Sequence, residues 1–280
     1  MRSNFFSLLF LILTSFCFSQ QKDIKLPKSE GFEIKYPKNT ITPILSVYIN
    51  KKEEVFLEDI KIDSLPELGN YIIEHRSKLD PSLVPFVLMF LHADSELKYS
   101  IIDKIKSELS SAYVWRVFYR TNHIEDITQG VGLRNQAALS YRKSAIKIDT
   151  LDSNVEFIEV IDLIKKHPIE ELRDDLYALN FELVKTKLSK YKYKKMEFFS
   201  ENELKIGDKL IKLSNEEEIF NELKDLDVYF ISSNKELKYG DYLKTISTIT
   251  KLYRAKKRSI PYIELSFELI RILKKKGITL

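Results

Sequence analysis

The segment Phe90-Leu-His-Ala-Asp-Ser-Glu-Leu-Lys-Tyr99 nearly recurs 140 residues later as Phe230-Ile-Ser-Ser-Asn-Lys-Glu-Leu-Lys-Tyr239. Five of the ten positions are identical, and Asp94 is matched by the near-isosteric Asn234. Each copy ends an apolar run that is typical of a strand and opens a run with helical periodicity. Internal sequence repeats indicate repeated structural units, so we expect two copies of one small domain.

The first copy lies within a segment whose patterns predict a mixed sheet. Apolar runs predict strands over 44–49, 55–62, 84–91 and 114–119. Helical periodicity predicts one helix that begins at an N-capping Ser64 and another over 97–112. The order β-β-α-β-α-β is typical of an α/β (α+β) fold, in which helices cover one face of a small mixed sheet.

The second copy follows the same order. Strands are predicted over 203–206 and 209–213, and further strands over 228–232 and 260–265. The spacing of Ser214 and Glu217 predicts a capping box before a helix, and a second helix is expected over 237–255. The two capping serines lie 150 residues apart rather than 140. We therefore expect the extra residues of the first copy to lie between Glu74 and Leu83.

We expect the chain to have four parts. They are a signal peptide over 1–19, a first module over 40–122, a mainly helical connecting segment over 123–200 and a second module over 201–280. The connecting segment has patterns for a strand over 144–149 and for helices over 155–166 and 169–190. The last of these helices could pack between the modules.

The N-terminal residues have the layout of a secretory signal peptide. A basic start, Met1-Arg2, precedes an apolar stretch from Phe5 to Phe16, and Cys17-Phe-Ser19 supplies a cleavage site before Gln20. The apolar stretch is shorter than the ~20 residues that span a bilayer. A retained membrane anchor is the alternative interpretation.

Composition limits the classes of protein that the chain can represent. The chain has 280 residues, of which 44% are hydrophobic, and its net charge is +4. This high hydrophobic content and small net charge favour packed domains over disorder. Cys17 is the only cysteine, so cleavage would leave none in the mature protein. Disulfides, thiol catalysis and cysteine-ligated zinc are then excluded.

The repeated segments contain the only candidate binding positions that we identify: Asp94, Tyr99, Asn234 and Tyr239. Asp94 and Asn234 end central strands, where open α/β sheets often bind ligands. Capping of the following helix is the simpler explanation, because both residue types cap well. Tyr99 and Tyr239 could line a surface, although an aromatic residue at this position of an amphipathic helix more often belongs to the core.

No other motif indicates catalysis, a cofactor or a metal. Gly130-Val-Gly132 lacks the third glycine of a dinucleotide-binding fingerprint. The basic and aromatic stretch 190–195 would suit nucleic acid, but export argues against that partner. A solvated strand or helix end explains it more simply, and anionic envelope polymers or lipid head groups are the alternative ligands. None of the histidines has the spacing of a metal-binding pair: His75, His92, His123 and His167.

The first module resembles the periplasmic domain of the ExbD/TolR biopolymer-transport family over about residues 44–121, and the second module does so more faintly over 203–265. The residues that carry the resemblance are Val47-Tyr-Ile-Asn50, Phe90-Leu-His-Ala-Asp94, Tyr99 and Val117-Phe-Tyr-Arg-Thr121. The resemblance implies an envelope protein whose relatives sit in the inner membrane and partner ExbB/TolQ-type proteins to use the proton motive force. Members carry a transmembrane aspartate, whereas residues 3–19 here contain no carboxylate.

We therefore expect an exported, non-catalytic ExbD-like protein of the periplasm that binds a protein partner or an envelope polymer. The partner could be ExbB-like or TonB-like, and a homodimer is another form the protein could take. The alternative is an accessory subunit of an ExbB/ExbD-type complex that is anchored in the inner membrane. An enzyme with an unfamiliar site is the third hypothesis. We expect no cofactor, no nucleic acid and no small-molecule substrate.

Overall fold

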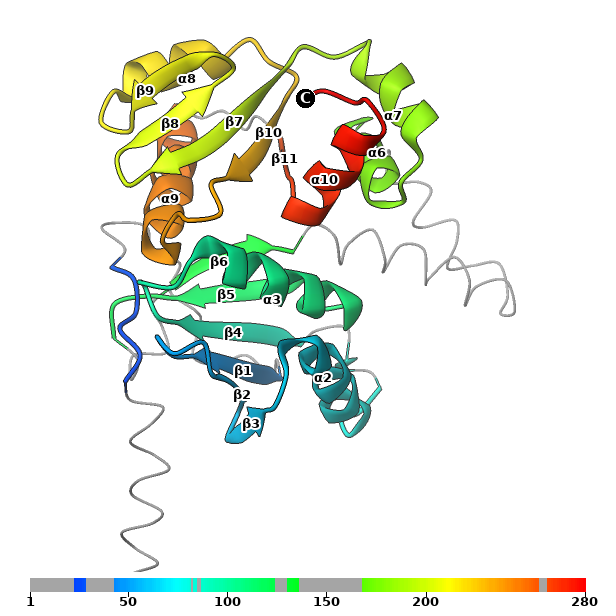
Figure 1. Cartoon of the computed structure of the whole chain (residues 1–280), viewed down its shortest axis with the longest axis vertical. Coiled ribbons are helices and arrows are strands. Elements are labelled where there is room, and N and C mark those ends of the chain that lie inside the picture. Colours follow the sequence, from blue (N-terminus) through cyan, green and yellow to red (C-terminus); the bar gives the residue numbers. More distant parts are fainter. Residues whose placement is uncertain are drawn as a thin grey trace, which may run out of the picture.

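A computed structural model of the chain describes residues 23–28, 43–81, 83–84, 87–123, 130–135, 168–256 and 261–280. Two sheets organise these residues, one with six strands and one with five. Figure 1 shows the second module above the first, with α9 and α10 reaching toward the first sheet. The expected signal peptide over 1–19, the strand over 144–149 and the helix over 155–166 lie outside the described residues.

The first sheet has the strand order β3-β2-β1-β4-β5-β6. Its central strands β1, β4 and β5 are parallel to one another, and the strands at both edges are antiparallel to their neighbours. The strands are β1 (Ile44–Ile49), β2 (Val55–Leu57), β3 (Ile60–Ile62), β4 (Leu88–Ala93), β5 (Arg116–Arg120) and β6 (Gly130–Arg134). Every residue of β4 is buried, as expected for a central strand covered on both faces.

The second sheet has the order β11-β10-β7-β8-β9. Read from β9, this is the same order as the first sheet read from β3 to β5. Its strands are β7 (Tyr193–Ser200), β8 (Glu203–Ile206), β9 (Lys209–Lys212), β10 (Val228–Ser233) and β11 (Tyr262–Glu264). The strands β7, β10 and β11 are parallel, and β7, β8 and β9 are antiparallel in turn. The expected α/β architecture of two sheet-and-helix modules is therefore confirmed.

One strand of the second sheet lies earlier in the chain than the expected start of that module. β7 begins at Tyr193 and occupies the place that β1 has in the first sheet, between a parallel and an antiparallel neighbour. Its apolar side chains at Met196 and Phe198 are fully buried, whereas the charged residues between and before them are partly exposed. The basic stretch 190–195 thus leads into a core strand.

Each module places helices against its sheet, and these helices share one core. Leu68 and Ile72 pack into this core from the first helix, and Ile219 and Leu223 pack into it from the corresponding helix of the second module. The same core contains residues of both sheets, so the modules bury their apolar faces jointly. The elements are η1 (Leu65–Glu67), α2 (Leu68–Ser77), α3 (Tyr99–Ser111), α8 (Glu216–Leu223) and α9 (Tyr239–Ala255).

The helix starts differ from the expected caps. Ser64 precedes η1, but its side chain accepts no capping hydrogen bond. In the second module the cap lies one residue later than expected, because the Asn215 side chain accepts from the Glu218 amide. Ser64 therefore occupies the predicted cap position without a capping hydrogen bond, whereas the cap predicted at Ser214 lies at Asn215. Asparagine caps helices as well as serine does, so two adjacent residues competed for this position.

The second sheet carries a further layer on its opposite face. There, α6 (Pro168–Tyr177), α7 (Phe181–Leu188) and α10 (Phe267–Lys275) cover a separate core that includes Val228 and Phe230 of β10. The single helix expected over 169–190 is two helices, because Leu179 adopts a positive φ of 59° between them. Among the described residues, no helix is both long and apolar enough to cross a membrane.

Equivalent core substitutions test whether the modules unfold together. Leu91→Ala in β4 and Ile231→Ala in β10 each remove a nearly fully buried side chain. Each should cost about 2–5 kcal/mol of unfolding free energy and should shift one cooperative transition, because one core spans both modules. Thermal and denaturant unfolding measure this. Ile60→Ala on the edge strand β3, where Ile60 is 47% exposed, serves as the mild control. Two separate transitions in either core variant would contradict the shared core.

Candidate functional site

The two repeated segments lie against each other. The Tyr99 amide donates to the Leu237 carbonyl at 2.6 Å, and the Tyr239 amide donates to the Leu97 carbonyl at 2.7 Å. Lys98 and Lys238 form the antiparallel bridge at the centre of this pairing. Each half of the contact repeats the other with the modules exchanged, which is the pattern of an isologous interface inside one chain.

Ion pairs beside the bridge follow the same reciprocal rule. Lys98 lies 2.6 Å from Glu236, and Lys238 lies 2.7 Å from Glu96. All four side chains are at least one-third exposed, so these pairs contribute little stability but favour this register. The repeated Glu-Leu-Lys was visible in the sequence as a self-complementary charge pattern.

Asp94 and Asn234 hold equivalent turns before the helices. Asp94 accepts from the Glu96 amide at 2.9 Å, and Asn234 accepts from the Glu236 amide at 3.0 Å. The other carboxylate oxygen of Asp94 accepts from the Lys25 amide. Helix α3 takes Lys98 as its N-cap, so Asp94 fixes the turn that precedes the helix. This role is structural and explains why either residue type suits the position.

Tyr99 and Tyr239 have different surroundings despite their equivalent positions. Both side chains are buried. The Tyr99 hydroxyl donates to Glu264 at 2.6 Å, and its ring stacks on Tyr242 at 4.3 Å. The Tyr239 ring lies 6.4 Å from that of Tyr119, and its hydroxyl has no hydrogen-bond partner among the described residues. The pseudo-symmetry of the junction therefore ends at these side chains, and only Tyr99 reaches a charged group.

Glu264, the last residue of β11, is the centre of a polar cluster between the modules. Its carboxylate accepts from the hydroxyls of Tyr99 and Tyr242 and lies 2.5 Å from the Lys106 ammonium. Burial alone would raise the pKa of Glu264, but the Lys106 charge and these hydrogen bonds outweigh it and lower that pKa. The cluster joins α3 of the first module to β11 of the second with a fixed anion at its centre.

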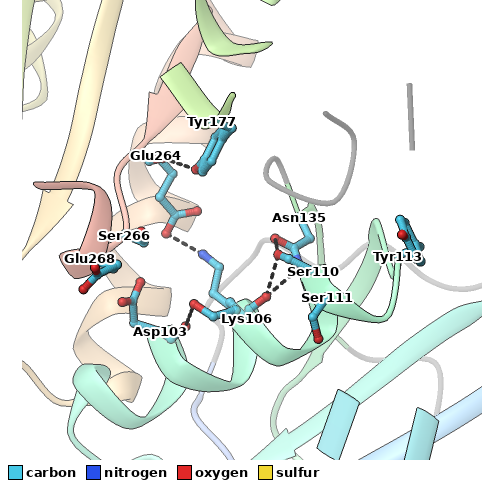
Figure 2. A pocket seen from close by; sticks show the side chains of 11 residues that line it. Asp103, Lys106, Ser110, Ser111, Tyr113, Asn135, Tyr177, Glu264, Ser266 and Glu268 are labelled. Carbon is cyan, nitrogen blue, oxygen red and sulfur yellow. Dashed lines mark hydrogen bonds and ion pairs between the residues drawn. The ribbon is translucent and has the colours of Figure 1, made fainter. Parts of the chain in front are cut away.

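A cavity of about 500 Å³ opens beside this cluster. Figure 2 shows Asp103 and Lys106 rising from α3 toward Glu264 and Ser266 of the second module. The connecting segment adds Tyr177 from α6, whose hydroxyl donates to the Glu264 carbonyl at 2.6 Å. The lining residues are Asp103, Lys106, Ser107, Ser110, Ser111, Tyr113, Asn135, Tyr177, Glu264, Ser266 and Glu268.

Asp103 is the titratable group of this cavity whose charge is least compensated. One carboxylate oxygen accepts from the Phe267 amide at 3.1 Å. Burial raises the pKa of Asp103 to about 6, against the lowering effects of that hydrogen bond and of Lys106, and Glu264 adds a smaller rise. A group that titrates near neutral pH in a cavity is a candidate for ligand binding or proton transfer.

Metal binding has no support in the described part of the chain. No group of three histidine, cysteine or acidic residues there has the geometry to hold an ion. His92 stacks on Tyr48 at 4.3 Å within the first sheet, and burial, with a smaller effect of Arg120, lowers the pKa of His92 to about 3. It is therefore neutral and lies in a core position.

The residues of this cluster are absent from the sequence-based candidates apart from Tyr99. Asp103 and Lys106 occupy the inward face of α3 beside Ile102 and Ile105, where charged residues interrupt an apolar stripe. That interruption was the available signal, because buried charges in a helix face need partners. The sequence did not indicate that Glu264 is buried, because a glutamate in a short edge strand is usually exposed to solvent.

Comparisons of the chain with protein-family models, with curated proteins and with solved structures find no match.

Glu264→Gln tests the buried cluster. The amide cannot balance the Lys106 charge, so the variant should lose about 3–5 kcal/mol of unfolding free energy. Tyr242→Phe removes one charged hydrogen bond and should cost about 1.5–3 kcal/mol. Chemical denaturation measures both. Glu268→Gln, whose exposed partner is Arg271, should change stability little. Equal effects of Glu264→Gln and Glu268→Gln would contradict the central place of Glu264.

Asp103→Asn should stabilise the protein at neutral pH. Between about pH 4 and pH 6 the native state keeps a proton that the unfolded chain releases, so the contribution of Asp103 to stability falls as pH rises through that window. The variant should therefore gain about 2 kcal/mol at pH 7.5 and nothing at pH 4. Denaturation curves at both pH values test this. A loss of stability at pH 7.5 would show that ionised Asp103 is well compensated.

Proposed function

We propose that the protein is an exported, non-catalytic ExbD-like component of the bacterial cell envelope. On this proposal its two modules together bind a protein partner or an envelope polymer in the cavity between them. The observation that carries the proposal is the composition of that cavity, which takes residues from α3, from the position after β6, from α6 and from β11 and α10. A site assembled from both modules gives the duplication a role in binding.

The ExbD-like part of the proposal is supported by the arrangement of both modules. In each, three strands that are antiparallel in turn precede a helix, a buried central strand and a second helix, in the order of the resemblance. The segments that carry the resemblance, around Asp94 and Tyr99, form the junction itself. Partners of the ExbB-like or TonB-like kind remain part of this proposal.

The chemistry of Glu264 favours binding over catalysis. Its carboxylate already receives two tyrosine hydroxyls and the Lys106 ammonium, so it is held as a structural anion. A general base needs a lone pair that can reach the substrate. Lys106 is likewise committed, which leaves neither group ready for proton transfer.

One observation favours an enzyme as the second candidate. Asp103, unlike the committed Glu264, lines the cavity with a pKa raised to about 6 by burial, which suits a general acid. Hydrolysis of the bound polymer would be the reaction class. The binding experiment below separates this candidate from the first when the supernatant is analysed for released fragments.

The experiment uses the full chain expressed in a bacterium. The mature protein should begin at Gln20 by N-terminal sequencing and fractionate with the periplasm. A start at Met1 in the membrane fraction would overturn export and favour the anchored accessory subunit.

The purified mature protein should also co-sediment with isolated cell-wall polymer. Ser107→Trp places a bulky ring on an exposed lining residue and should reduce this binding at least fivefold. Ser77→Trp, on the exposed side of α2, makes the same exchange away from the cavity and should leave binding unchanged. Equal binding by both variants would contradict the cavity as the site, and release of polymer fragments would favour the enzyme.

A further inference from the structure

We propose that the cavity between the modules binds an organic ammonium group, such as a primary amine on a hydroxylated or amide-bearing chain, with Asp103 as its counter-ion. This inference rests on the proposed function and names the ligand chemistry of the same site. It follows from the hydrogen bonds and charges of the lining residues, considered in turn below.

The hydroxyls of the three lining serines of α3 each donate a hydrogen bond to a backbone carbonyl of the same helix. Ser107 donates to the Asp103 carbonyl, Ser110 to the Lys106 carbonyl and Ser111 to the Glu108 carbonyl, all within the helix. The oxygens of these hydroxyls keep lone pairs, so they present acceptors to the cavity. A ligand that donates hydrogen bonds therefore fits this wall better than one that accepts them.

Three residues on the other walls, Lys106, Tyr177 and Asn135, also use donors in hydrogen bonds or ion pairs within the protein. Lys106 is paired with Glu264, and the Tyr177 hydroxyl donates to the Glu264 backbone carbonyl. The Asn135 amide donates to the Lys106 carbonyl, and its oxygen lies 3.1 Å from the Ser110 hydroxyl, whose single proton goes to the nearer Lys106 carbonyl at 2.7 Å. Ser266, which accepts from the Leu269 amide, and Tyr113 keep hydroxyl protons, so the negative charge of the lining is what disfavours a phosphate or carboxylate ligand.

The charge of the lining is negative. It contains the carboxylates of Asp103, Glu264 and Glu268 against the single ammonium of Lys106. Lys106 compensates Glu264, and Arg271 compensates Glu268 from outside the cavity at 2.5 Å. Asp103 remains as the anion without an ion pair among the described residues. A monovalent cation would restore neutrality.

Asp103 itself supplies the independent observation. Its side chain is only 8% exposed, and one carboxylate oxygen accepts from the Phe267 amide. The second oxygen has no hydrogen-bond partner within the described residues, and the side chain lines the cavity, where Figure 2 shows it directed toward Ser266 and Glu268. This second oxygen is accessible from the cavity, so a bound ammonium would supply both a proton donor and a compensating charge to a largely buried anion.

The protonation state of Asp103 makes the affinity for an ammonium group depend on pH. Lys106, Glu264 and Glu268 are the charged groups that share the cavity with Asp103, and the hydroxyls of Tyr99 and Tyr242 lie behind Glu264. Because the pKa of Asp103 is about 6, acidification to pH 5 leaves roughly a tenth of it ionised. An aliphatic amine stays charged over this range, so affinity should fall about tenfold from pH 7.5 to pH 5.

Three probes of one length separate charge from shape: 1,5-diaminopentane, 5-amino-1-pentanol and 1,5-pentanediol. Binding to the full mature protein is measured by calorimetry at pH 7.5 and pH 5. The two amines should bind at pH 7.5, and the diol should bind at least tenfold more weakly. Asp103→Asn should weaken amine binding about tenfold and remove its pH dependence. The variant keeps an oxygen that can accept from Phe267, so its fold is checked by thermal unfolding.

Asp241→Asn is the matched control. Asp241 lies on α9 outside the cavity lining, and burial also raises its pKa. This variant should bind the amines as the unmodified protein does. Equal loss of binding in both variants, or binding of the diol as tight as that of the amines, would overturn the inference.

The outcomes also separate this inference from the proposed function. If the cell-wall polymer binds in a manner that Ser107→Trp blocks while the amines fail to bind or compete, the ligand class is wrong and the function stands. If the amines bind through Asp103 while no polymer does, the inference holds and the proposed function fails. If neither binds, both fail.

Discussion

The contact between Glu264 and Lys106 is the interaction on which the arrangement of the modules depends. The two groups come from different modules, and the tyrosine hydroxyls around them satisfy the carboxylate as it leaves water. A buried charge without a partner is strongly destabilising, so neither module can retain its half of the pair alone. This constraint couples the position of β11 to that of α3. The cavity lies beside the pair, so its walls are set by the same coupling.

The repeated segments make the junction self-complementary. Each contributes one amide, one carbonyl, one lysine and one glutamate to the other, as two copies of a protein do across a two-fold axis. The side chains beyond this bridge have diverged. Tyr99 reaches Glu264, whereas the hydroxyl of its counterpart Tyr239, whose ring lies beside that of Tyr119, has no hydrogen-bond partner among the described residues. A symmetric scaffold thus carries one asymmetric polar site.

Much of the fold could be predicted from the sequence, because periodic apolar patterns report which faces are buried. The repeat correctly indicated two sheet-and-helix modules, and β4 and β10 lie where the paired segments placed central strands. β7 escaped prediction because Lys194 and Lys195 precede its buried Met196 and Glu197 separates Met196 from Phe198, so no apolar run marks the strand. The cluster at Glu264 escaped as well, since its members lie far apart in the chain and only tertiary packing brings them together.

The covalent connection between the modules changes what the small polar bridge at Lys98 and Lys238 needs to achieve. Between separate molecules, two backbone hydrogen bonds and exposed ion pairs would not offset the loss of translational and rotational freedom. Within one chain the covalent linkage already removes most of this freedom, because it holds the modules at a high effective concentration. In a symmetric dimer, one substitution changes both halves of the interface. In this single chain a substitution in one module changes only one half, so the residues near the bridge can diverge independently.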